Sequence, residues 1–506
     1  MVMEQFMSRE SMPEKIRRAQ AEIERKKDIV KKGKMRQHYH FMAQTGWIND
    51  PNGLVYFRGK YHWFFQYNPY YGLWDYMHWG HAVSEDMIHW EYLPLALAPS
   101  ETYDDYIRGG CFSGSAIEHE GKLYLIFTGT TNSENGCEQT QCVAWSEDGI
   151  YFEKYENNPV LTAPEWILPS LFRDPKVWKH GDKFYMVCGA GSRDGKGQAL
   201  LYCSDDLLHW DFVNVLAESR GEWGIMWECP DFYQLGDAYV LTISPIKAGE
   251  HTAVYFTGDF DYDTGKFAWQ VSGEMDWGFD YYAPQSFVTE DGRRIVVSWA
   301  NEWEWMPFFK DWGPTYLEGW CGFFNLPREV RLTEDRTLQF VPIKELETIR
   351  TDGRKTDGFT VGEKELELKA GDGISFEMKM EIDLEETDAD ELEIFLRCGG
   401  ERRTVCTFDL KRAELRVDRN ASDGWSKGIS RSVLFLKGKQ TLDIHIFSDQ
   451  SSVEIFADGY QNNHAVNVFA GKEQNEIRIR AQRGRVVVKT YESYGMKECY
   501  ADGKVD

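Results

Sequence analysis

Short runs of aromatic and β-branched residues fill the chain from about residue 37 onward, and Gly, Asp and Asn turns separate them. Examples are GLVYFRGKYHWFFQYN, KLYLIFTG, KFYMVCGA, AYVLTIS and RIVVSWAN. Many short segments of this kind, bounded by turn residues, are typical of β-strands rather than of helices. The sequence therefore predicts an all-β chain.

A turn motif recurs along the first part of the chain, each time after an apolar run. The copies begin at Ser84, Ser146, Ser204 and, in degenerate form, Thr257, at spacings of 62, 58 and 53 residues. Ser-Asp turns are common in β proteins, but regular recurrence with a trailing aromatic residue favours the outer hairpin of a propeller blade. We therefore predict a five-bladed β-propeller over residues 37–342, with its functional pocket on the central axis.

The composition of the chain changes after Pro342. Residues 343–356 are polar, include the short helical stretch IKELETIR and are predicted to form a linker. About eight alternating strands follow, with turn signals roughly every ten residues, which is typical of a β-sandwich. We predict that this second domain covers residues 357–506.

One strongly helical segment, residues 14–36, lies within a predicted N-terminal extension of residues 1–36. Its apolar residues near one face are Ile16, Ala19, Ile23 and Val30. The segment is locally basic, and Gly33 is predicted to end the helix. A solvated helix packed on the body is the favoured interpretation, and a docking surface or a contact in a homo-oligomer is the alternative.

The charge of the chain excludes some classes of partner. Lys and Arg total 57 and Asp and Glu total 82, so the formal net charge is −25. Such a charge repels nucleic acid and anionic membrane surfaces. No apolar stretch is long enough to span a membrane, and the N-terminus lacks the features of a signal peptide. The ten cysteines form no CxxC pair and are expected to be reduced, so we predict a cytoplasmic protein.

Three carboxylates stand out by their surroundings: Asp50 in WINDPNG, Asp174 in FRDP and Glu228 in WECPD. Each lies at the entrance to a β run in a different predicted blade, among large apolar residues. A buried carboxylate is costly, so each is either a turn cap or a functional group. Three of them near equivalent positions of separate blades favour a functional set.

Paired carboxylates of this kind can cleave glycosides. One attacks the anomeric carbon, and the other, kept protonated by an apolar site, donates its proton to the leaving oxygen. We predict that Trp227 and Cys229 desolvate Glu228 and raise its pKa, which suits the acid. The side-chain amides next to Asp50 are predicted to keep it ionised, as a nucleophile requires, and Arg173 is predicted to keep Asp174 charged.

These motifs, in this order and spacing, resemble glycoside hydrolase family 32, the β-fructofuranosidase group of invertases, sucrose-6-phosphate hydrolases, inulinases and levanases. The segments FFQYNP, HWGHA, GCFSGSA, DYYAPQSF and SSVEIFADG also resemble this family, so the likeness covers about residues 37–490. It implies a five-bladed propeller followed by a β-sandwich. It also implies that Asp50 is the nucleophile, Glu228 the general acid/base and Asp174 the stabiliser of the transition state.

The resemblance also implies a fructose-binding pocket. Its predicted lining residues are Trp47, Asn49, Gln66, Trp74, Phe112, Ser113, Arg173, Asp280, Tyr282 and Trp299. Aromatic faces suit packing on a sugar ring, and the amide and hydroxyl groups suit hydrogen bonds to sugar hydroxyls. Tyr282 and Trp299 rest on looser motifs and could instead belong to the core. Ile48 stands where many family members have Met, a volume-conserving change.

The resulting expectation is a retaining, exo-acting β-fructofuranosidase that needs no metal or cofactor. Its substrate would be a small sugar: sucrose, sucrose 6-phosphate or a short fructo-oligosaccharide. The alternatives are a fructosyltransferase with the same residues, a non-catalytic fructan-binding propeller and an inverting propeller hydrolase of arabinosides. His78 and His81 lack the partners of a zinc site. We find no basic cluster that would recognise a phosphorylated leaving group.

Overall fold

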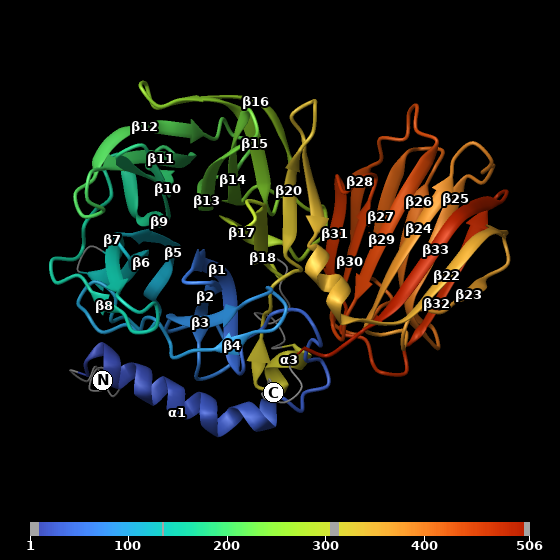
Figure 1. Cartoon of the computed structure of the whole chain (residues 1–506), viewed down its shortest axis with the longest axis horizontal. Coiled ribbons are helices and arrows are strands. Elements are labelled where there is room, and N and C mark those ends of the chain that lie inside the picture. The colour runs from blue at the N-terminus through green and yellow to red at the C-terminus, as the bar shows by residue number, and fades with distance from the viewer. Residues whose placement is uncertain (1–9, 134–135, 304–312, 500–506) are drawn as a thin grey trace.

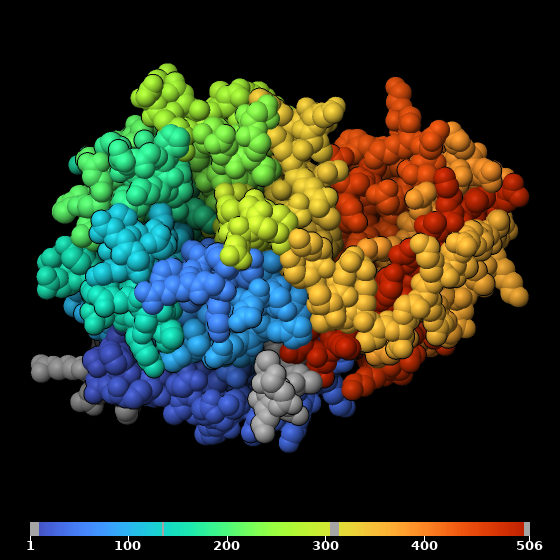
Figure 2. Space-filling view, viewed as in Figure 1, coloured from blue at the N-terminus to red at the C-terminus, as the bar shows by residue number. Residues whose placement is uncertain are grey.

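A computed structural model describes residues 10–133, 136–303 and 313–499 of the chain. It contains two β-rich bodies side by side, with one long helix beneath the first body (Figure 1). In the space-filling view the two bodies are packed together along the segment drawn in yellow (Figure 2). The prediction of an all-β chain, with a propeller followed by a sandwich, is confirmed.

Five small sheets make up the first body. The first two contain β19 (Trp320–Cys321), β1 (Gly46–Phe57), β2 (Lys60–Asn68), β3 (His78–Ser84) and β4 (Glu91–Tyr92), and then β5 (Gly110–His119), β6 (Lys122–Ser133), β7 (Gly136–Ser146) and β8 (Glu153–Lys154). The next two contain β9 (Ile167–His180), β10 (Lys183–Ser192), β11 (Gly197–Ser204) and β12 (Asp211–Glu218), and then β13 (Met226–Leu235), β14 (Ala238–Ile246), β15 (Val254–Asp261) and β16 (Lys266–Glu274). The fifth contains β17 (Tyr282–Val288), β18 (Arg294–Trp299), β20 (Arg328–Leu332) and β21 (Leu338–Pro342).

In each sheet, the strand that comes first along the chain faces the centre of this body. These inner strands are in contact as a closed ring, in the order β1, β5, β9, β13, β17 and back to β1. After the fifth sheet has begun, β19 returns to pair in parallel with β1, so a late segment of the chain joins the first sheet. The number of sheets agrees with the predicted number of blades.

Every inner strand carries a register shift at a corresponding point. The residues at these shifts are Asn49-Asp50, Phe112-Ser113, Arg173-Asp174, Glu228-Cys229 and Tyr282-Ala283. In four of the five strands proline comes next, which cannot donate a ladder hydrogen bond and therefore suits a bulge. A β-bulge bends a strand and changes where side chains point. The repeated bulge therefore brings chemical groups from all five sheets to the central axis.

The recurring motif lies in the predicted outer hairpins of four sheets, and in three of them it forms the same turn. In the first copy the Ser84 hydroxyl accepts hydrogen bonds from the backbone of Asp86 and Met87, and the Asp86 carboxylate accepts from the next two backbone N–H groups. The copies at Ser146 and Ser204 form similar turns. The fourth, degenerate copy also lies in an outer hairpin, β15–β16, but its turn begins at Asp261 rather than near Thr257, because β15 pairs with β16 as far as Asp261.

The second body is a sandwich of two six-stranded sheets. One contains β22 (Arg350–Val361), β33 (Val486–Met496), β24 (Phe376–Asp383), β29 (Thr441–Ser448), β30 (Ser452–Ala457) and β31 (Asn462–Asn467). The other contains β23 (Leu366–Leu368), β32 (Glu476–Gln482), β25 (Glu391–Gly399), β26 (Arg402–Asp409), β27 (Glu414–Asp418) and β28 (Ile429–Val433). The alternating apolar residues of both sheets form one core. The 3-10 helix η2 (Lys344–Ile349) precedes it, and β22 begins inside the segment that was predicted as a linker.

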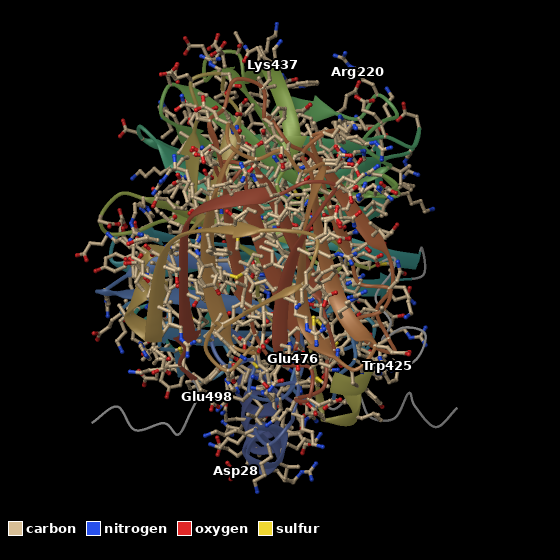
Figure 3. All side chains as sticks on the ribbon, turned by 90° about the vertical axis from the view of Figure 1, so that its right-hand side faces the viewer. Asp28, Arg220, Trp425, Lys437, Glu476 and Glu498 are labelled. Carbon is tan, nitrogen blue, oxygen red and sulfur yellow. The ribbon has the colours of Figure 1, made fainter. Side chains whose placement is uncertain are left out.

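The helix α1 (Met12–Val30) ends at Val30, three residues before Gly33, where its end was predicted. Its buried residues include Ala19, Ile23 and Val30, and it packs on the first body. Seen from the sandwich side, α1 projects at one end of the molecule, where Asp28 is labelled (Figure 3). A short helix, α3 (Pro314–Leu317), precedes β19. Within the described part of the chain, no helix has the length and apolar character to cross a membrane.

A chain of buried charges joins the two bodies. The Arg328 guanidinium lies 2.8 Å from Asp276 and 2.7 Å from Glu454 of the sandwich. The other carboxylate oxygen of Glu454 lies 3.0 Å from His40 Nε2, and His40 Nδ1 lies 2.9 Å from Asp449. All five side chains are buried, and their opposite charges alternate. We refer to these five residues as the interface cluster.

Candidate active site

A cavity of about 500 Å³ opens at the centre of the propeller, and all five inner strands line it. That volume is within the range of small-molecule sites. Ten of the predicted residues line this cavity: Asn49, Asp50, Gln66, Trp74, Phe112, Ser113, Arg173, Asp174, Glu228 and Tyr282. The structure therefore brings the three candidate carboxylates together, although long stretches of chain separate them.

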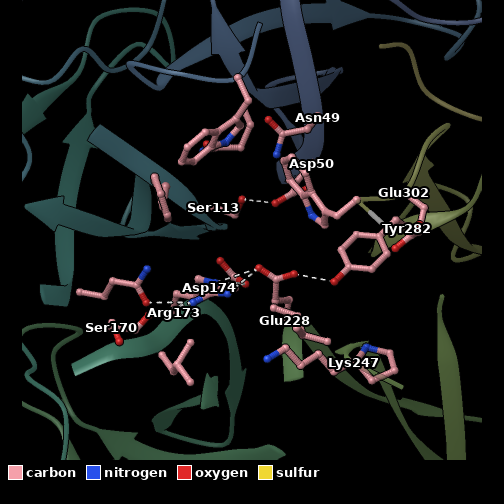
Figure 4. Close-up of a pocket in the computed structure, with 18 of the residues that line it drawn as sticks. Asn49, Asp50, Ser113, Ser170, Arg173, Asp174, Glu228, Lys247, Tyr282 and Glu302 are labelled. Atoms are coloured by element: carbon pink, nitrogen blue, oxygen red, sulfur yellow. Dashed lines mark hydrogen bonds and ion pairs between the residues drawn. The ribbon is translucent and has the colours of Figure 1, made fainter. Parts of the chain in front are cut away.

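Two of the carboxylates, Asp50 and Asp174, are held from one side by Cys229. Its sulfur lies 3.5 Å from Asp50 Oδ2 and 3.6 Å from Asp174 Oδ2, and its backbone N–H donates to Asp174 Oδ2 at 2.9 Å. The Ser113 hydroxyl donates to Asp50 Oδ2 at 2.6 Å (Figure 4). Asp50 Oδ1 has no hydrogen-bond partner among the described residues. This oxygen is buried, while the residue itself lines the cavity.

The third carboxylate, Glu228, is held at both oxygens. Arg173 donates to Oε1 from Nε at 2.9 Å and from Nη2 at 2.7 Å, and the Tyr282 hydroxyl donates to Oε2 at 2.5 Å (Figure 4). Gln139 in turn accepts from Arg173 Nη1 at 3.1 Å. These contacts fix the position of the carboxyl group, which a proton donor to a bound sugar requires.

The environment of Asp50 and Asp174 favours their protonated forms. Burial raises the pKa of Asp50 to about 6, the charge of Glu228 adds to this effect, and the Ser113 hydrogen bond opposes it. Burial likewise raises the pKa of Asp174 to about 7, where Arg173 opposes and the other two carboxylates reinforce it. Three acids share one guanidinium here, so the site holds a proton close to neutral pH.

These electrostatics differ from the sequence prediction in two respects. Asp50 was expected to be ionised readily, but burial outweighs the donors around it. Arg173 was expected to serve Asp174, but it lies 2.7 Å from Glu228 and 3.9 Å from Asp174. The position of Arg173 next to Asp174 in the sequence did not predict its ion-pair partner. The bulge turns these two neighbouring side chains toward different partners.

The residues that flank Glu228 also act differently from the prediction. The Trp227 ring packs on Phe256 at 5.8 Å, within the core between two blades, and its indole N–H donates to the carbonyl of Trp223. Cys229 contacts Asp50 and Asp174. Neither side chain forms an apolar environment for Glu228, because neighbouring strand residues point in different directions.

Three predicted lining residues do not line the cavity. Trp47 and Trp299 lie behind it, with ring centroids 5.7 Å apart, and the Trp47 indole N–H donates to Asn49 Oδ1 at 2.7 Å. Asp280 is buried at the junction with the sandwich, where it lies 2.8 Å from Arg419 and accepts from the backbone of Asn467 at 2.6 Å. Its carboxylate therefore joins the two bodies.

Sequence reasoning missed several residues that line the cavity: Arg108, Thr130, Gln139, Ser170, Leu171, Lys247, His251, Glu302 and Trp303. Glu302 and Trp303 lie three and four residues after the predicted Trp299 and could have been included on that ground. Lys247 and His251 lie in a loop between two strands, where no motif marked them. Their position depends on how blades meet, which a single sequence does not reveal.

Comparisons with known proteins agree with this architecture. The model described as "Glycosyl hydrolases family 32 N-terminal domain" matches residues 40–342, and "Glycosyl hydrolases family 32 C terminal" matches residues 345–495. A sucrose-6-phosphate hydrolase of Zymomonas mobilis is 36% identical over 492 residues, which covers 91% of this chain and 92% of that protein. A sucrose-6-phosphate hydrolase of Bacillus subtilis is 33% identical, with 92% and 97% covered.

Solved structures give the same result. The GH32 β-fructofuranosidase of Bombyx mori, a mutant in complex with sucrose, is 31% identical and covers 96% of this chain and 98% of its own, with a TM-score of 0.80. The sucrose-6-phosphate hydrolase of Lactobacillus gasseri is 25% identical, with 95% and 96% covered and a TM-score of 0.82.

Proposed function

The chain belongs to glycoside hydrolase family 32 and is a glycoside hydrolase, and we propose that it is a retaining, exo-acting β-fructofuranosidase of sucrose and short fructosides. The observation that carries the proposal is the convergence of Asp50, Asp174 and Glu228 on one cavity of the propeller. Names of relatives at more than 30% identity support the fructoside class of substrate.

The three carboxylates have distinct roles in the proposed reaction. Asp50 attacks the anomeric carbon of fructose, and an ester bond forms as the glycosidic bond breaks. Glu228 gives its proton to the departing oxygen, and then takes a proton from the water that attacks the anomeric carbon and releases Asp50. Asp174 accepts hydrogen bonds from sugar hydroxyls, which strengthen as positive charge develops.

Arg173 and Tyr282 act through Glu228. Both donate to its oxygens, so they orient the carboxyl group before the sugar arrives. When Glu228 carries a proton, one of these oxygens becomes a donor, and the glycosidic oxygen is the acceptor that the reaction supplies. The cavity also presents the faces of Trp74 and Phe112, whose rings lie 5.8 Å apart, to a sugar ring.

The shape of the site supports release of terminal units. The cavity lies within a ring of five strands, so a sugar enters from one end and a terminal fructose fits more readily than the interior of a polymer. Fructosyl transfer would use the same residues, with a sugar in place of water in the second step. A cytoplasmic location and a homo-oligomeric state stay predictions from the sequence.

Product analysis with sucrose and kestose tests the proposal. We expect equal amounts of fructose and glucose from sucrose, and successive release of single fructose units from kestose. Longer fructosides as the main product would instead indicate a transferase. Glu228→Gln is expected to lose at least ~10²-fold in kcat/KM on sucrose and much less in the first step on fructosyl fluoride, which needs little protonation. Equal losses on both substrates would contradict the role of Glu228.

A further inference from the structure

A buried lysine attaches the helix α1 to the propeller. Lys15 is only 2% exposed, although the sequence predicts that apolar residues form the packed face of this helix. Its ammonium lies 2.8 Å from the Asp105 carboxylate and donates to the Tyr76 hydroxyl at 2.9 Å, and that hydroxyl donates to Asp105. Lysine is almost never fully buried unless it is paired, and these contacts meet that requirement. We refer to Lys15, Tyr76 and Asp105 as the lysine cluster.

The lysine cluster joins α1 to two loops at the entrance of the cavity. Tyr76 belongs to residues 69–77, which connect β2 to β3 and which we call the entrance loop, and Asp105 belongs to residues 93–109, which connect β4 to β5. The end of β2 pairs with the start of β1, close to its catalytic bulge, and the second loop runs directly into β5, close to the bulge of that strand. A backbone hydrogen bond of 2.9 Å also joins the two loops. The lysine cluster therefore lies beside the site, on a helix that contributes no residue to it.

Two more cations of α1 hold the other end of the entrance loop. Arg18 donates to the Tyr70 hydroxyl at 3.3 Å, and its guanidinium lies 5.9 Å from the centre of the Tyr70 ring. Lys26 donates to the Tyr70 carbonyl. Lys15, Arg18 and Lys26 are spaced by three and eight residues, so they lie on one face of the helix. The basic residues on this face of α1 therefore contact the entrance loop at both of its ends.

Trp74 lies in the entrance loop between the two tyrosines that α1 contacts, and it lines the cavity. Its ring meets Phe112 edge to face at 5.8 Å and Trp303 edge to face at 6.3 Å. Binding costs less free energy when the side chain that receives the ligand is already ordered. The contacts of α1 with Tyr70 and Tyr76 therefore restrict the motion of Trp74 before a sugar arrives.

We propose that α1 determines the affinity for sugar, because Lys15 fixes the entrance loop in the conformation that presents Trp74 to the cavity. The proposal rests on the proposed function, in which the Trp74 ring faces the sugar. Lys15 itself does not line the cavity, so it is a positioning residue. The cost of desolvating its charge offsets much of its attraction to Asp105, so we expect the lysine cluster to determine the geometry of the loop more than the stability of the fold.

Steady-state kinetics on sucrose test the proposal. Lys15→Met is expected to raise KM by ~3–10-fold and to change kcat by less than ~2-fold, because Trp74 must then be ordered when the sugar binds. Tyr76→Phe keeps the ring and removes only the hydroxyl, so it should show the same split with a smaller rise in KM, and it provides the test if Lys15→Met folds poorly. Lys27→Met removes an exposed pair with Glu24 on the same helix, and as the control it should leave both constants unchanged.

A double-mutant cycle shows whether Lys15 acts through Trp74. Trp74→Ala should raise KM by itself, because the ring that faces the sugar is lost. Adding Lys15→Met to Trp74→Ala should change KM by less than ~2-fold further, since the side chain to be positioned is absent and the two effects are then not additive. The full rise in KM in both backgrounds would overturn the proposal, because Lys15 would then act on binding by another route.

Hydrogen exchange of the backbone measures the order of the entrance loop without any need for turnover. We expect peptides that cover residues 69–77 to exchange faster in Lys15→Met than in wild type, and at the wild-type rate in Lys27→Met. If wild type releases no fructose from sucrose, the proposed function fails, and the exchange rates still decide whether α1 orders the loop. If wild type is active and Lys15→Met and Tyr76→Phe change neither KM nor the exchange of this loop, the role of α1 alone is overturned.

Discussion

The molecule buries two groups of charged side chains, and they differ in the ratio of cations to acids. The interface cluster alternates three acids with two cations, Arg328 and His40, and each acid accepts from at least one of them. The catalytic site collects three acids around the single guanidinium of Arg173, whose two closest contacts both go to Glu228. Burial is similar in both places, so the number of available cations distinguishes them.

The ratio of cations to acids influences the protonation of the acids together with burial, which raises the pKa of Asp276 although Arg328 opposes it. Burial alone would raise the pKa of Asp449, but the hydrogen bond and charge of His40 lower it to about 2. The same neighbours raise the pKa of His40 to about 9, although burial opposes this. At the catalytic site Arg173 lies 3.9 Å from Asp174 but closer to Glu228, and burial raises the pKa values of Asp50 and Asp174 to about 6 and about 7. Alternating charges hold the bodies together, and the acids that outnumber their single cation remain reactive.

The largest effect is expected from Asp50→Asn. The change is nearly isosteric but removes the proposed nucleophile, so kcat should fall by at least ~10⁴-fold. Because a buried, poorly compensated carboxylate is also removed, the melting temperature at pH 7 should not fall. Steady-state kinetics and thermal unfolding monitored by circular dichroism check both parts. Activity above one hundredth of wild type, in protein free of wild-type enzyme, would exclude Asp50 as the nucleophile.

Breaking the interface cluster should act on stability instead. Arg328→Met leaves Asp276 and Glu454 without their guanidinium, and removal of one partner from a buried pair costs ~3–5 kcal/mol of unfolding free energy. Denaturant titration at pH 7 measures this. The matched control is Arg331→Met on the same strand, whose exposed pair with Glu329 should contribute no more than ~1 kcal/mol. Similar losses in both variants would contradict a special role for the interface cluster.

Asp174→Asn, at the catalytic site, should raise the free energy of unfolding rather than lower it. The folded chain retains a proton on Asp174 up to about pH 7, whereas the unfolded chain loses it near the ordinary pKa of an aspartate. Between these values the unfolded state binds fewer protons, so wild-type stability falls as pH rises. The variant lacks this loss and should be more stable than wild type by ~1–3 kcal/mol at pH 8, with a smaller advantage at pH 5.

The measurement for Asp174→Asn is denaturant unfolding at several pH values, together with kinetics. An advantage that shrinks as pH rises would contradict the account. Activity should nevertheless fall by ~10²–10³-fold, as is typical when one stabilising contact to the transition state is lost. The variant would then be more stable and less active, which is the trade-off expected of a functional site.

The smallest effect concerns the acid limb of the pH profile. Since Asp50 must be ionised to attack, kcat/KM should fall as pH drops through about 6. Ser113→Ala removes a hydrogen bond that favours the ionised form, so this limb should move to higher pH by roughly half a unit to one unit. Ser115→Ala, which removes a hydroxyl bonded to the carbonyl of Pro175, is the control and should not move it. A shift to lower pH would contradict the assignment.

Much of the fold could be predicted because its causes are local. Alternating apolar residues mark strands, and the turns at Ser84, Ser146 and Ser204 repeat because each uses the same side-chain bonds to backbone. The position of the fourth turn could not be predicted in this way, since pairing with β16 carried β15 past Thr257.

The candidate site was predictable to the extent that its groups lie at the bulges. Trp47 and Asp280, two residues before a bulge, were harder to place, because a bulge changes where side chains point and Asp280 is held by the sandwich. The partners of Arg173 and the loop cations Lys247 and His251 depend on contacts between blades. No local pattern in a single sequence encodes such contacts.

The central claim is that the three acids of the cavity perform the chemistry, with Asp50 as the nucleophile. Trapping the intermediate tests it most directly. In Glu228→Ala, fructosyl fluoride can still react in the first step, because fluoride needs little protonation, but the second step lacks its general base. We expect mass spectrometry of digested protein to find a fructosyl group as an ester on Asp50. A label on Asp174, or release of α-fructose as the first product with no label on any peptide, would contradict the account.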